Sequence, residues 1–174
     1  MKKIAMLHTS SATLAMMQQL IGDIMPEAEV MHLVEESMIK QVMKAGGVTP
    51  DIAARIADYV RIAEKADCEI FITACSSIGT AVEQCQFMTP LQLARIDCAM
   101  VEKAISLGEN IAVLATVATT MKPTLEYVQR KIQASGKLCS VTPILMEEAF
   151  HALLAGDMET HDRIVSEGLH SAYK

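Results

Sequence analysis

Cys75 is the residue whose position most favours chemistry, because it follows an apolar run (residues 69–74) and precedes a segment of helical character. A thiol at the start of a helix is exposed to the positive end of the helix dipole and to free backbone N–H groups, and both favour the thiolate. Ser76, Ser77 and Gly79 leave backbone amides that can bind an anion such as a carboxylate. Cys75 is therefore either an acid/base group beside an anion site or a small buried residue at the end of a strand.

Hydroxyl groups follow two other apolar runs of the chain. These side chains can donate hydrogen bonds to a carboxylate, or they can cap the helices that come next. They belong to Thr9 and Ser10 after the run at residues 4–7, and to Thr116, Thr119 and Thr120 after the run at residues 111–115. Ligands of parallel α/β sheets bind at the carboxyl ends of strands, so we expect the Cys75 and Thr116 segments to face one anion pocket. His8 fits a packed strand-end histidine better than a base or a substrate contact.

Metal and nucleotide sites are not indicated by any motif. His151, His161 and His170 lie ten and nine residues apart, and no pair of them has the spacing of metal ligands. Neither GxGxxG nor GxxxxGK[ST] is present. We therefore expect no metal and no nucleotide cofactor.

The elements that position these residues follow from the alternation of short apolar runs with stretches of helical period. Continuously apolar strands that alternate with helices predict an α/β fold, a three-layer parallel sheet with helices on both faces. We expect two similar halves, residues 1–95 and 96–174. The predicted strands are residues 4–7, 30–34, 69–74, 111–115 and 138–141. The predicted helices are residues 10–25, 38–44, one that starts at Thr49-Pro50, one that starts at Asp97, one capped by Thr119 or Thr120, residues 146–154, and one that starts at Asp157.

Composition excludes several classes of partner. The chain has 174 residues, 51% of them hydrophobic, and a formal net charge of −6. Its longest apolar run, at residues 111–115, is far shorter than the ~20 residues of a membrane-spanning helix. The acidic balance and the scarcity of aromatic residues argue against a nucleic-acid partner. The five cysteines form no CxxC pair, and their odd number is typical of a reduced, cytoplasmic protein.

Four segments carry a resemblance to a known family. They are Thr73–Gly79, Arg95–Asp97 with the helix after it, Ile111–Thr116 with the Thr119-Thr120 and Pro123-Thr124 pairs, and Glu148–Asp162. Together they resemble the aspartate/glutamate/hydantoin racemase superfamily, over nearly the whole chain.

The resemblance implies proton transfer, without PLP or another cofactor, at the carbon next to the carboxylate of a small substrate such as an amino acid, a hydantoin or a malonate. In the family one cysteine thiolate removes the α-proton, and a second thiol returns a proton from the opposite face. Cys75 matches the first cysteine, and Thr9 and Ser10 match the loop that contacts substrate. The positions that hold the carboxylate are matched by Ser76, Ser77, Thr116, and Thr119 or Thr120.

The family's second cysteine follows a further strand, which would lie downstream of Lys174. On this ground we expect the chain to be truncated or naturally short, to racemise neither aspartate nor glutamate, and to bind a small carboxylate. A bare sheet edge favours pairing with another copy, so we expect a homo-oligomer such as a dimer. Two alternatives stay open: a catalytically inert carboxylate-binding protein, and a one-cysteine enzyme of the decarboxylase kind.

Overall fold

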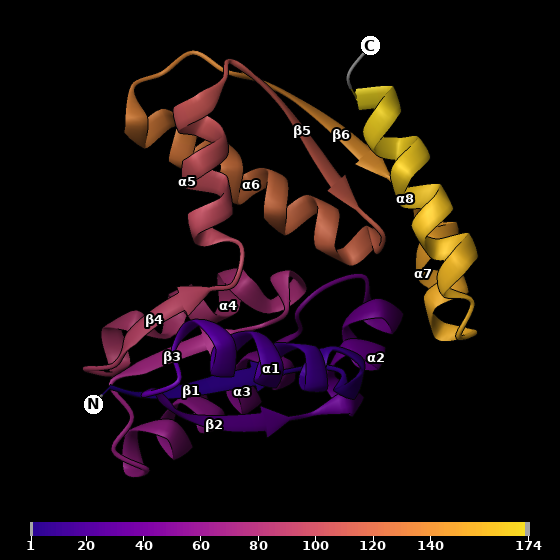
Figure 1. Cartoon of the computed structure of the whole chain (residues 1–174). Helices are drawn as coiled ribbons and strands as arrows, with labels where there is room; N and C mark the ends of the chain where they lie inside the picture. Colours follow the sequence, from indigo (N-terminus) through magenta and orange to yellow (C-terminus); the bar gives the residue numbers. More distant parts are fainter. Residues whose placement is uncertain (1, 173–174) are drawn as a thin grey trace. The chain divides into compact units, whose positions relative to one another are not determined.

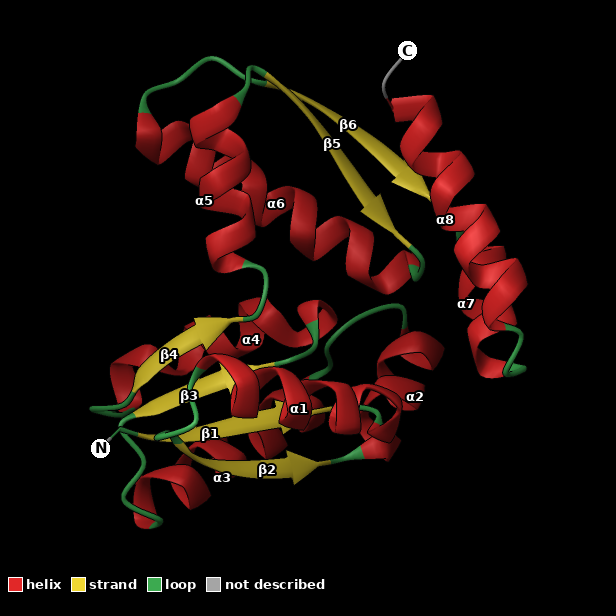
Figure 2. Cartoon of the chain, in the orientation of Figure 1, coloured by secondary structure: helices red, strands yellow, loops and turns green. Residues whose placement is uncertain are grey.

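The computed structural model describes residues 2–172, which divide into two compact units (Figure 1). The first unit ends at Cys98 and the second begins at Ala99. Both units consist of parallel strands with flanking helices, as Figure 2 shows by colour, and the α/β prediction is confirmed. None of the described helices combines the length and the apolar character that crossing a membrane requires.

The first unit contains a four-stranded parallel sheet in the order β2-β1-β3-β4. The strands are β1 (Lys3–His8), β2 (Glu29–Val34), β3 (Ile70–Thr73) and β4 (Gln92–Arg95). His8 pairs with Val34, Leu7 with Thr73, and Thr73 with Arg95. This register brings the carboxyl ends of all four strands to one edge of the sheet.

The helices of this unit start and stop where the sequence supplies caps. Ser10 caps the turn η1 (Ser11–Thr13), which leads into α1 (Leu14–Ile24). Gly46 ends α2 (Glu36–Ala45) in the left-handed conformation, with φ 71°. Thr49 accepts a hydrogen bond from the Ile52 amide, and Pro50 opens α3 (Pro50–Lys65) as predicted. After β3 come η2 (Ser76–Ile78), α4 (Gly79–Gln84) and η3 (Cys85–Met88).

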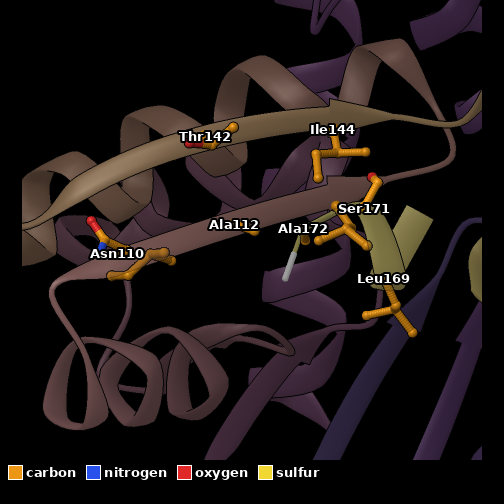
Figure 3. Close-up of a pocket in the computed structure, with 9 residues that line it drawn as sticks. Asn110, Ala112, Thr142, Ile144, Leu169, Ser171 and Ala172 are labelled. Carbon is orange, nitrogen blue, oxygen red and sulfur yellow. The ribbon is translucent and has the colours of Figure 1, made fainter. Parts of the chain in front are cut away.

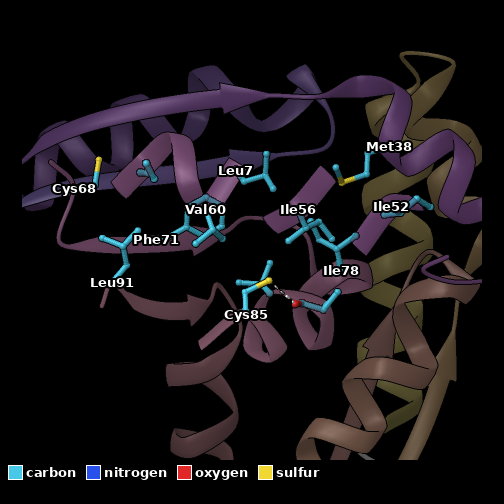
Figure 4. Close-up of a cluster of buried hydrophobic side chains, with 14 of the residues drawn as sticks. Leu7, Met38, Ile52, Ile56, Val60, Cys68, Phe71, Ile78, Cys85 and Leu91 are labelled. Carbon is cyan, nitrogen blue, oxygen red and sulfur yellow. Dashed lines mark hydrogen bonds between the residues drawn. The ribbon is translucent and has the colours of Figure 1, made fainter. Parts of the chain in front are cut away.

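The hydrophobic core of the first unit lies between the sheet and α3 (Figure 4). Leu7 of β1 and Phe71 of β3 contribute from the sheet, and Ile56 and Val60 contribute from α3. Successive strand residues point to opposite faces, so Ile4, Met6 and His8 of β1 face the other side, and they are buried as well. Both faces of the sheet are therefore covered.

The second unit is built around β5 (Asn110–Ala115) and β6 (Ser140–Leu145), which are parallel. Its helices are α5 (Cys98–Leu107), α6 (Ala118–Ser135), α7 (Glu147–Leu154) and α8 (Met158–Ala172). Alternate residues of β5 are buried, as are Val101 and Ile105 of α5 and Val128 of α6. One face of this small sheet thus forms a second core.

Three local predictions are wrong. β4 was not predicted, because a strand of four residues with a mixed burial pattern has no clear apolar period. β6 begins later than expected and extends through Pro143, which is tolerated because among the described strands β6 pairs only with β5. Thr119 and Thr120 do not cap α6: the helix begins at Ala118 with Val117 at its N-cap, which places both threonines in the first turn.

We expect Ile56→Ala to lower the free energy of unfolding by about 2–5 kcal/mol, because Ile56 is fully buried and the truncation leaves a cavity. Ile62→Ala on the same helix is the matched control, since Ile62 is 46% exposed and its truncation should cost much less. Urea unfolding of both variants measures the difference. Equal losses would contradict the placement of the core.

Candidate functional site

The backbone of Cys75 is held by the side chain of Thr73 at the end of β3. The Thr73 hydroxyl accepts a hydrogen bond from the Cys75 amide and donates one to the Cys75 carbonyl, both at 3.1 Å. Thr73 is fully buried, so this hydroxyl clamp is shielded from water. Ala74 also donates its amide to the Leu7 carbonyl, which ties the chain to β1 at 2.9 Å. The backbone of Cys75 is therefore fixed at the end of the sheet where the carboxyl ends of the strands lie.

The side chain of Cys75 is partly exposed and packs against the edge of the hydrophobic core. The prediction of a strand before it and a helical segment after it is confirmed, although the segment starts with the single turn η2 and α4 is short. Because the dipole of a short helix is weak, it stabilises a thiolate at its N-terminus less than a long helix would.

The next residues of the loop are anchored to β4. The Ser76 hydroxyl hydrogen-bonds the carboxylate of Asp97, and that carboxylate pairs with Arg95 through two bonds of 2.8 Å, one from Nε and one from Nη2. Burial alone would raise the pKa of Asp97, but the hydrogen bonds and charge of Arg95, with the Ser76 hydroxyl, hold it below its ordinary value. Glu83 of α4 approaches Arg95 Nη1 at 3.7 Å. Arg95 is 2% exposed, so this is a buried charge network.

Gly79 has no side chain and so leaves room for the guanidinium of Arg95. A Cβ at this position would lie 2.7 Å from the guanidinium carbon of Arg95, closer than real Cβ contacts. The start of α4 thus lies directly against the Arg95 side chain. The sequence motif Arg95–Asp97 predicts only the start of a helix, and the ion pair between its two ends is found in the structure. Two opposite charges two residues apart at a strand end would have been the signal.

The other cysteines occupy different positions. Cys68 and Cys85 are buried, and burial raises the pKa of both thiols. Cys98 is partly exposed as well and follows the end of β4 by three residues, as the first residue of α5, whereas Cys139 precedes β6. Cys75 differs from Cys98 in the buried Thr73 hydroxyl that holds its backbone.

Thr9 and Ser10 extend the same edge from β1. Thr9 is buried, and the Ser10 hydroxyl accepts a hydrogen bond from the Ala12 amide at 3.2 Å, which is a capping role. Ser77 is also buried. These three residues belong to the unit that holds Cys75, and their contact with substrate stays a prediction.

His8 is paired with His32, a residue that the sequence analysis did not single out. His8 is 1% exposed, and its Nε2 lies 2.9 Å from Nδ1 of His32. Among residues 2–172, no hydrogen-bond partner reaches the buried Nδ1 of His8. Burial lowers the pKa of His8, to which the neighbouring His32 adds, and burial lowers the pKa of His32. The lowered pKa values favour the neutral form of both imidazoles.

In the second unit, Thr116, Thr119 and Thr120 follow β5 and are partly buried. A hollow of about 810 Å³ lies elsewhere, along one face of β5 and β6 where α8 ends (Figure 3). Its lining among the described residues includes Ala112, Thr142 and Leu169, but no acid, base or thiol. Over residues 2–172 there is also no cluster of three or more histidine, cysteine or acidic side chains arranged to hold a metal ion.

We expect the free energy of unfolding to fall as the pH drops below about 6.5. Both imidazoles have lowered pKa values in the folded state, so the unfolded chain takes up protons first. Urea midpoints at pH 7.5 and 5.5 measure the loss, which should shrink in His8→Gln/His32→Gln and persist in the exposed control His151→Gln. A wild-type protein with equal midpoints at both pH values would refute the neutral pair.

Comparison with known proteins bears on the fold and the family. A solved structure similar to this chain is the glutamate racemase from Aquifex pyrophilus, with a TM-score of 0.64 and 16% identity, covering 82% of this chain and 54% of that chain. At that identity the likeness concerns the fold, and the chain spans about half the length of that racemase.

The 1-deoxy-D-xylulose 5-phosphate reductoisomerase from Zymomonas mobilis, solved in complex with NADPH, has a TM-score of 0.25 and 10% identity over 83% of this chain and 38% of that chain, too little likeness to support an argument. No curated protein matches the sequence. Residues 4–172, however, match the family described as Asp/Glu/Hydantoin racemase. Because this match extends over nearly the whole chain, the protein belongs to the Asp/Glu/hydantoin racemase family.

Proposed function

We propose that this protein transfers a proton at the carbon next to the carboxylate of a small acid, with Cys75 as the acid/base group and without PLP. Family membership supports the reaction class. The observation that carries the assignment to Cys75 is its partly exposed thiol at the end of β3, on a backbone held by the buried Thr73 hydroxyl. A base must keep its position relative to the substrate carbon, and this clamp provides that.

The chemical step needs more than a thiolate. When Cys75 removes the α-proton, the C–H bond breaks, an S–H bond forms, and the electron pair moves onto the carboxylate oxygens. The α-proton is weakly acidic, so hydrogen-bond donors must stabilise this charge as it develops. In the first unit we assign this task to four residues, Thr9, Ser10, Ser76 and Ser77.

Ser76 has a particular place in this scheme. Its hydroxyl is directed to Asp97, which leaves its oxygen lone pairs and its backbone amide for other contacts. The amide is the group of Ser76 that can donate to a substrate carboxylate. That Thr116, Thr119 and Thr120 also bind substrate, and that the protein forms a homo-oligomer, remain predictions.

Cys75 should react with iodoacetamide at neutral pH faster than the four other cysteines. Cys68 and Cys85 are buried with raised pKa values, and Cys75 differs from the partly exposed Cys98 and Cys139 in the backbone clamp that Thr73 provides. Mass spectrometry of peptides from briefly labelled, folded protein gives the five rates. Slower labelling of Cys75 than of Cys98 would argue for a packed thiol without a chemical role.

The activity itself is tested by exchange of the α-proton in heavy water with each enantiomer of aspartate and glutamate and with hydantoins. We expect deuterium at the α-carbon of at least one substrate, and a loss of about 10²-fold or more in Cys75→Ser. Cys98→Ser is the matched control and should keep the wild-type rate. A chiral assay on the same samples separates racemisation from exchange that retains configuration.

Two results would decide against the proposal. Absence of exchange with every substrate would remove the activity and leave a binding protein, which calorimetry with the same acids would detect. Exchange that survives in Cys75→Ser would assign the base to another residue.

A further inference from the structure

A buried ion pair has no evident function in holding the sheet together. Arg95 and Asp97 stand at the end of β4, 2% and 5% exposed, with two hydrogen bonds of 2.8 Å between them. A buried pair of this kind contributes little net stability compared with apolar side chains of the same volume. Its contacts instead point to the loop that carries Cys75.

The first contact is made by the carboxylate of Asp97. It accepts a hydrogen bond from the Ser76 hydroxyl, and Ser76 is the next residue after Cys75. The acceptor cannot move freely, because both of its oxygens are bound to Arg95. The position of Ser76 is therefore set by a charge held rigidly on β4.

The second contact is made by the guanidinium of Arg95. It occupies the space over Gly79, where a Cβ would collide with it at 2.7 Å, and it faces Glu83 of α4 at 3.7 Å. The Ile96 amide also donates to the Thr73 carbonyl at 3.0 Å, which fixes β4 against the strand that precedes Cys75. The loop is thus anchored to the pair at Ser76 and at the start of α4.

We propose that Arg95 and Asp97 are the positioning pair of the Cys75 loop, acting on the thiol through Ser76 and Gly79. This inference rests on the proposed function, in which Cys75 is the reacting group. The pair does not touch the substrate in this scheme. Its role is to restrict the motion of the loop, so that the half-buried thiol keeps one orientation.

The prediction concerns the rate at which Cys75 is alkylated by iodoacetamide between pH 6 and 9, with the partly exposed Cys139 of the second unit as an internal reference. Asp97→Asn removes the charge at nearly constant shape and should loosen the loop, which makes Cys75 more accessible. We expect the alkylation of Cys75 to speed up by about 3- to 10-fold, the shift that one lost hydrogen bond typically produces, while Cys139 keeps its rate. Catalysed exchange, where it is measurable in the wild type, should slow down.

Two further variants make the test specific. Ser76→Ala should speed up Cys75 alkylation in the same way, and Asp97→Asn/Ser76→Ala should do so no more than either single change, because both remove one shared contact. Glu35→Gln is the matched control: it breaks the ion pair between Glu35 and Arg55, which is 3.0 Å long and lies on other elements of the same unit. This control should leave the Cys75 rate unchanged.

Three results would contradict the positioning role of Arg95 and Asp97. Unchanged alkylation of Cys75 in Asp97→Asn, multiplied effects in the double variant, or an equal effect of Glu35→Gln would each overturn the positioning role. If Asp97→Asn does not fold, Ser76→Ala alone carries the same prediction, since it leaves the buried pair intact. Failure of exchange in the wild type refutes the proposed function, whereas the alkylation rates still test the positioning pair.

Discussion

The guanidinium of Arg95 is a buried charge, and the residues around it are arranged so that they compensate this charge. Without partners, burial of such a group would cost several kcal/mol. Asp97 supplies the opposite charge, Glu83 approaches from α4, and residue 79 must be glycine to leave room. Through these contacts the four-residue strand β4 is joined to the loop after β3, which carries Cys75.

The parallel register gives this framework its location. His8, Thr73 and Arg95 are far apart in the sequence, yet each stands at the carboxyl end of its strand, and these ends lie together. Backbone amides and carbonyls beyond the last ladder bonds need partners there. Thr73 satisfies those of Cys75, and side-chain hydroxyls satisfy others. The groups that hold the edge together are of the same kind as those that bind a carboxylate.

Family membership and the geometry of Cys75 support the proposed chemistry in different ways. Membership in the family supports the class of reaction that we propose, proton transfer on a small carboxylate. Exposure distinguishes Cys75 from the buried Cys68 and Cys85, and the hydroxyl clamp of Thr73 distinguishes it from Cys98 and Cys139. The His8–His32 pair lies at the same edge, but it is buried and neutral by construction, so its contribution is to the stability of the edge.

The sequence by itself determined the α/β class, the helix of residues 50–65, the strand before Cys75 and the family resemblance. These depend on periodicity, capping and local motifs, which neighbouring residues specify among themselves. The tertiary structure alone decided that His8 meets His32, that β4 exists, and that Asp97 contacts Ser76 instead of serving only as the start of a helix. Such contacts depend on strand order and register, which bring together residues as distant in the sequence as Leu7 and Thr73, and no local pattern encodes which strand lies beside which.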